Sequence, residues 1–329
     1  MPRRAAAAAA AAAIAPGKFA GARGVKKRKT DELGMPVKSE VGSPHLQVVT
    51  AQGKRDYQED AFGYVSTSSA HVFGVFDGHG GEQCSQYCSI KIPPAVAAHK
   101  HLGKTPRRAL TEVFCDIDSK FCREFDQSGS TATVGVLQAT GSGKYKLTVA
   151  NVGDSSAVLL RNGKSKMVKL SGLHHGSCPV ERDRIVKQGG LILFDYMDKI
   201  WRVQGVLSVT RAIGDASLKP YVIASPEIKE VFVVPGDLIL IASDGLWDEV
   251  NQDKVVEYLR GGPGLQALVD SIADVGEDNI TAMVVDVAKA IELLTCPGKI
   301  AENASATAAA TEAPTKKTVS PRSLAAKSS

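Results

Sequence analysis

The chain has 329 residues, of which 43% are hydrophobic, and it carries a formal net charge of +5 with a pI of about 8.8. Residues 1–44 hold nine Lys/Arg against three Asp/Glu, and residues 289–329 hold six against three, so the residues between them carry a net charge of −4. The basic pI belongs to the two ends, and the mildly acidic body disfavours nucleic-acid binding. No apolar run approaches the ~20 residues of a membrane span, so we expect no membrane partner.

Residues 1–44 are predicted to be a disordered, Ala-rich basic tail, because Phe19 is their only aromatic residue and they cannot build a core. The cluster Lys26-Lys27-Arg28-Lys29 is typical of a nuclear import signal. Arg3, Arg4 and the absence of acids before Asp31 are typical of an organelle transit peptide, although such peptides are usually rich in Ser. A solvated tail without a targeting role is the third interpretation. We expect a protein of the cytoplasm, the nucleus or both.

Residues 45–288 contain the pattern of one α/β body. In chain order, the apolar runs predict strands at 45–51, 72–76, 131–138, 145–151, 155–161, 191–194, 238–242 and 280–287, and helices at 81–90, 106–125, 179–188, 253–260 and 265–275. Short turns such as Asn162-Gly163 and Gly141-Ser142-Gly143 join neighbouring strands, which indicates antiparallel pairing. We therefore expect antiparallel sheets packed face to face with helices outside, in a monomer. Residues 289–329 lack aromatic residues and are predicted to be a disordered tail.

Six cysteines occur without a CxxC pair. Cys84 and Cys88 lie one helical turn apart, but no His or second Cys pair completes a zinc site. Reduced thiols in an intracellular compartment are expected.

Acidic residues stand where apolar runs meet turns, which is the main functional signal of the sequence. The five motifs are Arg55-Asp56-Tyr57-Gln58-Glu59-Asp60, Asp77-Gly78-His79-Gly80-Gly81, Gly153-Asp154-Ser155, Ser243-Asp244-Gly245 and Glu277-Asp278-Asn279. Carboxylates held close together at strand ends repel one another, and hard divalent cations with oxygen ligands compensate for that repulsion. The sequence therefore predicts a metal enzyme.

These motifs, together with Gly129-Ser130-Thr131-Ala132, Thr210-Arg211-Ala212-Ile213-Gly214-Asp215 and Ala242-Ser243-Asp244-Gly245-Leu246-Trp247-Asp248, resemble the protein phosphatase 2C family over residues 45–288. The resemblance implies a four-layer α-β-β-α sandwich with two Mg²⁺ or Mn²⁺ ions between the sheets. It also implies a metal-dependent phosphatase that acts on phosphoserine and phosphothreonine of phosphoprotein substrates by attack of a water that bridges the metals.

The resemblance also assigns roles to particular residues. Asp77 would bridge both metals, with the Gly78 carbonyl approaching one of them, and Glu59 would complete the second ion. Asp244 and Asp278 would bind the first ion, and Asp60 would lie in the outer shell. Arg55 would bind the phosphoryl oxygens, and His79 would be the general acid that protonates the leaving oxygen.

Two departures from the family pattern matter. Leu173 stands where an aspartate for a third metal is expected, and Ser156 stands where Arg is commoner. Leucine cannot bind Mg²⁺, so Leu173 leaves a third ion in question and is the one support for a pseudophosphatase that binds phosphoproteins without turnover. A metal-dependent nuclease is the other rival. Asp154 and Asp215 are left outside the predicted metal set, since an Asp after Gly often only caps a turn.

Residues 178–202 correspond to the variable flap of the family. Its apolar residues Phe194, Tyr196, Met197 and Trp201 suit local packing better than substrate contact.

Overall fold

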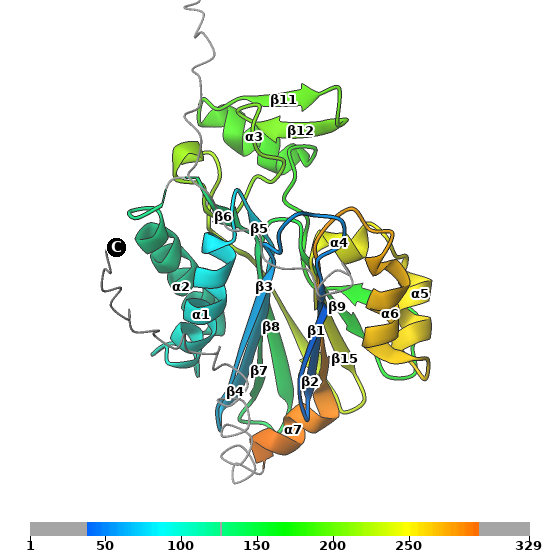
Figure 1. Ribbon diagram of the computed structural model, residues 1–329. Coiled ribbons are helices and arrows are strands. Elements are labelled where there is room, and N and C mark those ends of the chain that lie inside the picture. Colours follow the sequence, from blue (N-terminus) through cyan, green and yellow to red (C-terminus); the bar gives the residue numbers. More distant parts are fainter. Residues whose placement is uncertain (1–37, 126, 296–329) are drawn as a thin grey trace, which may run out of the picture.

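The computed structural model describes residues 38–125 and 127–295, in which two antiparallel sheets pack face to face (Figure 1). The six-stranded sheet has the order β1 (Lys38–Ser43), β2 (Leu46–Ala51), β16 (Ile280–Asp286), β15 (Leu238–Ala242), β9 (Ser156–Leu160) and β10 (Met167–Lys169). The five-stranded sheet has the order β14 (Glu227–Val233), β8 (Tyr145–Val152), β7 (Ala132–Ala139), β4 (Ala70–Phe76) and β3 (Ala61–Ser66). The predicted hairpins at residues 141–143 and 162–163 join β7 to β8 and β9 to β10.

Helices cover the outer face of each sheet, which completes four layers (Figure 1). Helices α1 (Gln83–Ala97) and α2 (Pro106–Phe121) pack on the five-stranded sheet, and α5 (Gln252–Leu259) and α6 (Gly264–Ala273) pack on the six-stranded sheet. The predicted α-β-β-α sandwich is confirmed.

The central strands are apolar on both faces because each lies between a helical layer and the other sheet. In β4, Phe76 packs in the cluster beneath α1 and α2, whereas Phe73 and Val75 pack between the sheets. In β15, Ile239 points between the sheets and Leu240 points toward α6. This double burial explains why these strands appear in the sequence as continuous apolar runs rather than as alternating ones.

A small flap module rises above the sandwich (Figure 1). It consists of α3 (Pro179–Lys187) and the hairpin of β11 (Ile192–Asp195) and β12 (Ile200–Val203), with its own small apolar cluster around Ile185 and Val203. Three two-residue strands form a separate small sheet: β13 (Ile213–Gly214), β6 (Gly129–Ser130) and β5 (Gly78–His79). The remaining elements are η1 (Ala216–Leu218) and α4 (Asp244–Trp247).

The folded part extends past both predicted boundaries, so the predicted tails 1–44 and 289–329 are wrong at their inner ends. Strand β1 pairs with β2 at the edge of the six-stranded sheet. Helix α7 (Val287–Thr295) closes the open end of the sandwich, where it buries Val287, Ala290 and Leu293. The amphipathic pattern of α7 gives it a core to pack on, although it has no aromatic residue. The Lys26–Lys29 cluster, Cys296 and the rest of both tails lie outside the described residues.

Within residues 38–125 and 127–295, no helix is both long and apolar enough to cross a bilayer. The five cysteines in this part of the chain, including Cys84 and Cys88, are free thiols.

Two buried histidines, His45 and His71, lie where α7 packs on the sandwich. His71 Nε2 donates to Ala290 O at 2.9 Å, so Nδ1 of the neutral ring accepts from Ser66 Oγ at 2.9 Å. The ring of His45 lies 4.5 Å from that of His71, measured between ring centroids. Burial, with the neighbouring His71 charge next, lowers the pKa of His45 to about 4, and burial lowers the pKa of His71. The folded protein therefore keeps both rings neutral.

Lowering the pH should reduce the free energy of unfolding, because the two histidines are kept neutral in the folded protein. An unfolded histidine has a pKa of about 6.5, so below that pH the unfolded state binds more protons and stability falls as pH falls toward about 4. We expect His45 alone to lower the free energy of unfolding by about 2 kcal/mol between about pH 7 and about pH 5.

Urea unfolding at the two pH values, compared with the same measurement on His45→Asn, isolates this contribution because all other titrating groups are common to both proteins. Equal pH dependence in the two proteins would contradict it.

Candidate active site

The predicted acidic residues meet because the strands before or after them end at one edge of the sandwich. β4 and β8 are both antiparallel to β7, so Asp77 and Asp154, which follow them, lie at the same edge. β15 is antiparallel to β16, so Asp244 after the former and Asp278 before the latter also share an edge. The two edges face each other across a pocket of about 230 Å³.

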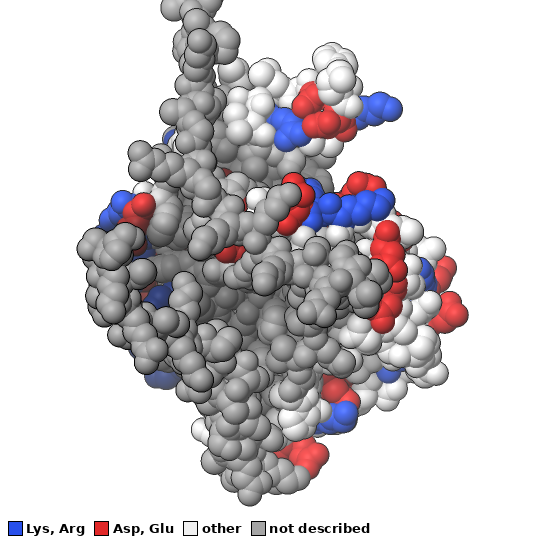
Figure 2. Space-filling view, viewed as in Figure 1, with Lys and Arg blue, Asp and Glu red and all other residues white. Residues whose placement is uncertain are grey.

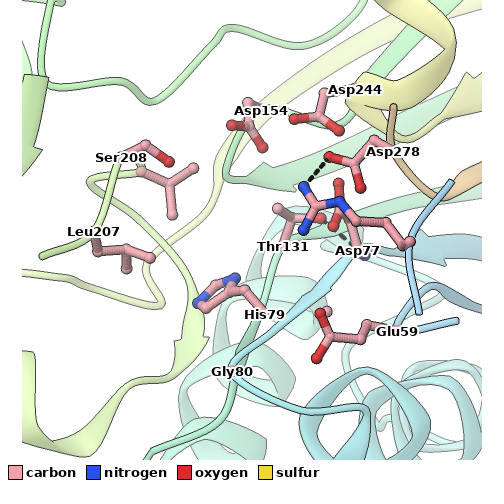
Figure 3. A pocket seen from close by; sticks show the side chains of 13 residues that line it. Glu59, Asp77, His79, Gly80, Thr131, Asp154, Leu207, Ser208, Asp244 and Asp278 are labelled. Carbon is pink, nitrogen blue, oxygen red and sulfur yellow. Dashed lines mark hydrogen bonds and ion pairs between the residues drawn. The ribbon is translucent and has the colours of Figure 1, made fainter. Parts of the chain in front are cut away.

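Seven of the eight predicted site residues line this pocket: Arg55, Glu59, Asp77, Gly78, His79, Asp244 and Asp278. Figure 3 shows the carboxylates of Asp77, Asp154, Asp244 and Asp278 gathered on one side of it, with Leu207 and Ser208 opposite. Figure 2 shows the notch between the flap and the body.

Three carboxylates form the tightest group. One oxygen each from Asp77, Asp154 and Asp244 lies within 4.8 Å of the others. Oxygen atoms at this spacing are the donors that Mg²⁺ and Mn²⁺ take. The group that the family implies therefore fits these residues.

The electrostatics of the cluster agree with that fit. Burial, followed by the charges of Asp60, Asp244 and Asp154, raises the pKa of Asp77 well above its ordinary value. Burial, followed by the charges of Asp154 and Asp278, raises the pKa of Asp244 to about 7. Both shifts show that the ionised carboxylates repel one another when no cation compensates for them.

Asp60 lies behind the pocket wall rather than in it. Ser243 Oγ donates to Asp60 Oδ2 at 2.8 Å, and burial raises the pKa of Asp60 to about 7. Asp60 thus joins the segment before β3 to the turn that presents Asp244. Asp60 is the one predicted site residue that does not line the pocket, and its outer-shell role stays a prediction.

Glu59 is held at the other end of the pocket. Its Oε1 accepts from the backbone N–H of Gly81 at 2.7 Å, and its own N–H donates to Asn279 Oδ1 at 2.8 Å. Asn279 Nδ2 donates to the carbonyls of Gln52 and Tyr57, at 2.8 and 2.9 Å. The side-chain amide of Asn279 therefore holds the loop that carries Arg55 and Glu59 against the start of β16.

Arg55 is paired with a predicted metal ligand. Its Nη2 donates to Asp278 Oδ2 at 2.8 Å, and the side chains are 55% and 38% exposed. An ion pair with this much exposure contributes at most about 1 kcal/mol, so a phosphate can compete for the guanidinium.

His79 has a partner that sequence reasoning missed. Its Nε2 donates to the carboxylate of Asp215, at 3.0 and 2.9 Å from the two oxygens. Burial lowers the pKa of His79, but the hydrogen bond and charge of Asp215, with smaller contributions from Asp154 and Glu59, raise it overall above its ordinary value. Asp215 has a left-handed backbone (φ 53°, ψ 48°), which is uncommon for a residue other than glycine. A strained backbone of this kind often marks a functional residue, but the sequence does not reveal it.

Gly129 makes this pair possible. A Cβ on it would collide with both Asp215 Oδ2 and His79 Nε2, so only glycine lets β6 pass beside them.

The structure places Asp154 in the carboxylate cluster and Leu173 outside the catalytic pocket. Asp154, which was left outside the predicted metal set, is in the carboxylate cluster and accepts from His175 Nε2 at 3.1 Å. Leu173 is 48% exposed and lines a neighbouring cavity instead of the catalytic pocket. The chain therefore places the Asp154 carboxylate beside Asp244, and the expectation that Leu173 leaves a third ion in question stays a prediction.

The flap contributes one wall of the pocket through Leu207, Ser208 and Val209, which follow β12. On the flap hairpin, the ring of Phe194 packs edge-on against Trp201 with centroids 5.1 Å apart, as local packing predicts. Tyr196 and Met197 are 83% and 89% exposed.

Comparison with known proteins agrees with this geometry. The family model of protein phosphatase 2C matches residues 45–267. The chain is 35% identical over 248 residues to "Probable protein phosphatase 2C 55" of Oryza sativa subsp. japonica, which covers 71% of this chain and 63% of that protein. It is 36% identical over 247 residues to "Probable protein phosphatase 2C 11" of Arabidopsis thaliana, covering 71% and 64%. The chain thus spans less than two thirds of the length of these two relatives.

Solved structures share the fold. A serine-threonine phosphatase 2C from Toxoplasma gondii superposes with a TM-score of 0.65 at 23% identity, covering 76% of this chain and 99% of that one. A C. elegans sex determining protein superposes with a TM-score of 0.64 at 23% identity, covering 76% and 66%. From the carboxylate edge, the motif order and the extent of the family match, this chain belongs to the protein phosphatase 2C family.

Proposed function

We propose that this protein is a Mg²⁺- or Mn²⁺-dependent protein serine/threonine phosphatase. The observation that supports it most is the single pocket that brings together the cluster of Asp77, Asp154 and Asp244, the guanidinium of Arg55 and the imidazole of His79. Hydrolysis of a phosphate ester needs a cation site, a group that neutralises the phosphoryl oxygens and a proton donor, and this pocket offers one of each.

Asp77, Asp154 and Asp244 would hold the cations, with Glu59, Asp278 and the Gly78 carbonyl as further oxygen donors from the pocket wall. When bound, such cations lower the pKa of a water enough to make it a nucleophile near neutral pH. Asp60 would position Ser243 and the turn before Asp244.

Arg55 would bind the phosphate. The loop that carries it is fixed by Asn279, and the guanidinium fork matches two phosphoryl oxygens. If Asp278 held a cation, its ion pair with Arg55 would weaken and the guanidinium would be available to the substrate.

His79 would protonate the leaving alkoxide. Because its Nε2 faces Asp215, Nδ1 is the nitrogen that can give up a proton. The raised pKa favours the protonated ring, which is the form that an acid catalyst needs.

The two rivals have less support. The pseudophosphatase has Leu173 as its one support, and the cluster of Asp77, Asp154 and Asp244 does not need a carboxylate at that position. For a nuclease a continuous basic surface is expected, whereas acidic and basic side chains are interspersed over the described part of the face in Figure 2.

The proposal predicts that the purified protein releases phosphate from a phosphothreonine peptide when Mn²⁺ or Mg²⁺ is present. Asp77→Asn should reduce release to the uncatalysed level, because the amide cannot replace the charge at the centre of the cluster. Asp116→Asn, which removes an exposed acid on α2 that pairs only with Lys120, is the matched control and should keep wild-type activity. Undetectable hydrolysis by the unaltered protein would favour the pseudophosphatase, and metal-dependent cleavage of plasmid DNA would favour the nuclease.

Asp154 should be a cation ligand. We expect Asp154→Asn to weaken Mn²⁺ binding by roughly tenfold or more in isothermal titration calorimetry, since one of three close carboxylates is lost. Asp248→Asn removes a neighbouring acid outside the cluster and serves as the control. If the two variants bind Mn²⁺ alike, Asp154 has no place in the metal set.

Asp215 should set the protonation of His79. Asp215→Asn removes the charge that opposes the effect of burial, so the pKa of His79 should fall. Asn also tolerates the left-handed backbone at this position, so the β13 turn is retained. An NMR titration of the imidazole signals, with His79→Gln to assign the resonance, measures the pKa directly. The alkaline limb of the activity profile should move to lower pH in parallel, and a pKa of His79 that does not change would count against the acid role.

A further inference from the structure

A second cavity of about 420 Å³ lies beside the catalytic pocket and is larger than it. The two share Asp154 and Asp244 as a common wall. Its volume falls within the range of roughly 300–1,000 Å³ that is typical of ligand sites. None of the roles argued above uses this space, which we call the side cavity.

The inner wall of the side cavity is apolar. Val158, Met167 and Val250 line it and are themselves 3%, 8% and 7% exposed, so they are fixed in the core. Trp247 also lines it, and its Nε1 donates to the carbonyl of Ala242 at 3.0 Å. Since the one polar atom of the indole is satisfied inside the protein, the ring offers apolar surface to the cavity.

Two polar groups of the wall, Ser171 and His175, already have partners. Ser171 Oγ accepts from the backbone N–H of Ala157 at 2.9 Å, and His175 donates to Asp154 at 3.1 Å. Asp154, Asp244 and Asp248 border the cavity and Lys169 also lines it, so charges of both signs surround it and favour neither an acidic nor a basic occupant. The lining therefore suits an uncharged, apolar group.

The two positions where the sequence departs from the family pattern both line this cavity. Ser156 is small where an Arg side chain is commoner, and Leu173 is apolar where an Asp is expected. The first substitution leaves space, and the second replaces a charge by apolar surface that is 48% exposed. The size and the apolar character of the side cavity thus depend on side chains particular to this chain.

We propose that the side cavity binds an apolar side chain of the substrate, from a residue that flanks the phosphorylated serine or threonine. The inference rests on the proposed phosphatase function. The two cavities share Asp154 and Asp244 as a wall, so a peptide whose phosphate lies in the catalytic pocket and whose chain runs past this wall brings a flanking residue to the side cavity. Extended chain advances about 3.3 Å per residue, so the flanking positions close to the phosphorylated residue are the ones to vary. Ser156, Leu173 and Trp247 are the residues that determine this specificity.

The kinetic test uses phosphothreonine peptides that differ at one flanking position at a time, with Leu, Phe, Ser or Glu there. At one such position we expect kcat/KM for Leu or Phe to exceed that for Ser by about tenfold, with Glu lowest. The double variant Ser156→Arg/Leu173→Asp fills the cavity and charges it, and should bring the Leu-to-Ser ratio close to one. Leu173→Ser alone, at an exposed position, should lower the ratio in the same direction and covers the case in which the double variant does not fold.

The matched control is Val275→Asp, which alters an exposed apolar residue after α6 outside both cavities and should keep the preference. Equal kcat/KM for all peptides with the unaltered protein, or a preference that survives in both cavity variants, would overturn the proposal.

A binding measurement separates this proposal from the phosphatase function. Trp201 and Trp247 are the two tryptophans of the chain, so Trp201→Phe leaves Trp247 as a fluorescent reporter in the cavity wall. Leu-flanked phosphopeptide should change its emission at lower concentration than Ser-flanked peptide, without any turnover. Failure to hydrolyse p-nitrophenyl phosphate and all peptides would contradict the phosphatase function alone. A Trp247 signal that does not distinguish Leu from Ser would contradict the side cavity alone.

Discussion

Repulsion among buried carboxylates is the constraint on which this structure depends. Asp77 sits between Asp60, Asp154 and Asp244, and both burial and their charges raise its pKa. A chain that only had to fold would not collect acids at the end of its best-packed strands, because each ionised group there is stabilised less than it is in water. The divalent cations proposed for this site would offset the unfavourable energy, and folding and cation binding would then be coupled at this edge of the sandwich.

Hydrogen bonds from other parts of the chain fix the positions of these acidic residues. Two of them are held by hydroxyl groups: Thr131 Oγ1 accepts from the Asp77 N–H at 3.1 Å, and Ser243 Oγ donates to the Asp60 carboxylate. Asn279 alone makes three hydrogen bonds to the loop of Arg55 and Glu59. Because these bonds join segments about 50 to 230 residues apart in sequence, the geometry of the pocket is a property of the whole sandwich.

The sequence predicted what depends on local pattern. The continuous apolar runs of β4 and β15 predicted buried strands, and the acid after each predicted the edge of the sheet at which Asp77 and Asp244 lie. The four layers came from the resemblance, since periodicity alone fixed only antiparallel sheets with helices outside. Helix α7 was missed because composition, rather than its amphipathic spacing, decided the boundary.

The pair of His79 and Asp215 could not be predicted from local pattern. The two residues are 136 positions apart, and an Asp after Gly in sequence is more often a turn residue. Asp154 was ambiguous for the same reason. What distinguishes both from an ordinary turn is the histidine that each one contacts, His79 for Asp215 and His175 for Asp154, and in the first case only folding brings the two residues together.

A buried ion-pair network joins the flap to the segment that forms the wall of the pocket. Glu181 on α3 is buried, and although burial raises its pKa, Arg211 and Arg184 lower it to about 2. Arg184 also donates to the carbonyls of Thr210 and Tyr221, at 2.9 and 2.8 Å. Removing one partner of such a buried ion pair costs about 3–5 kcal/mol, so the network does not open easily. Residues 207–209 of the pocket wall and Asp215 flank Arg211 in the chain, so the network around Glu181 joins α3 to the pocket wall and to the partner of His79.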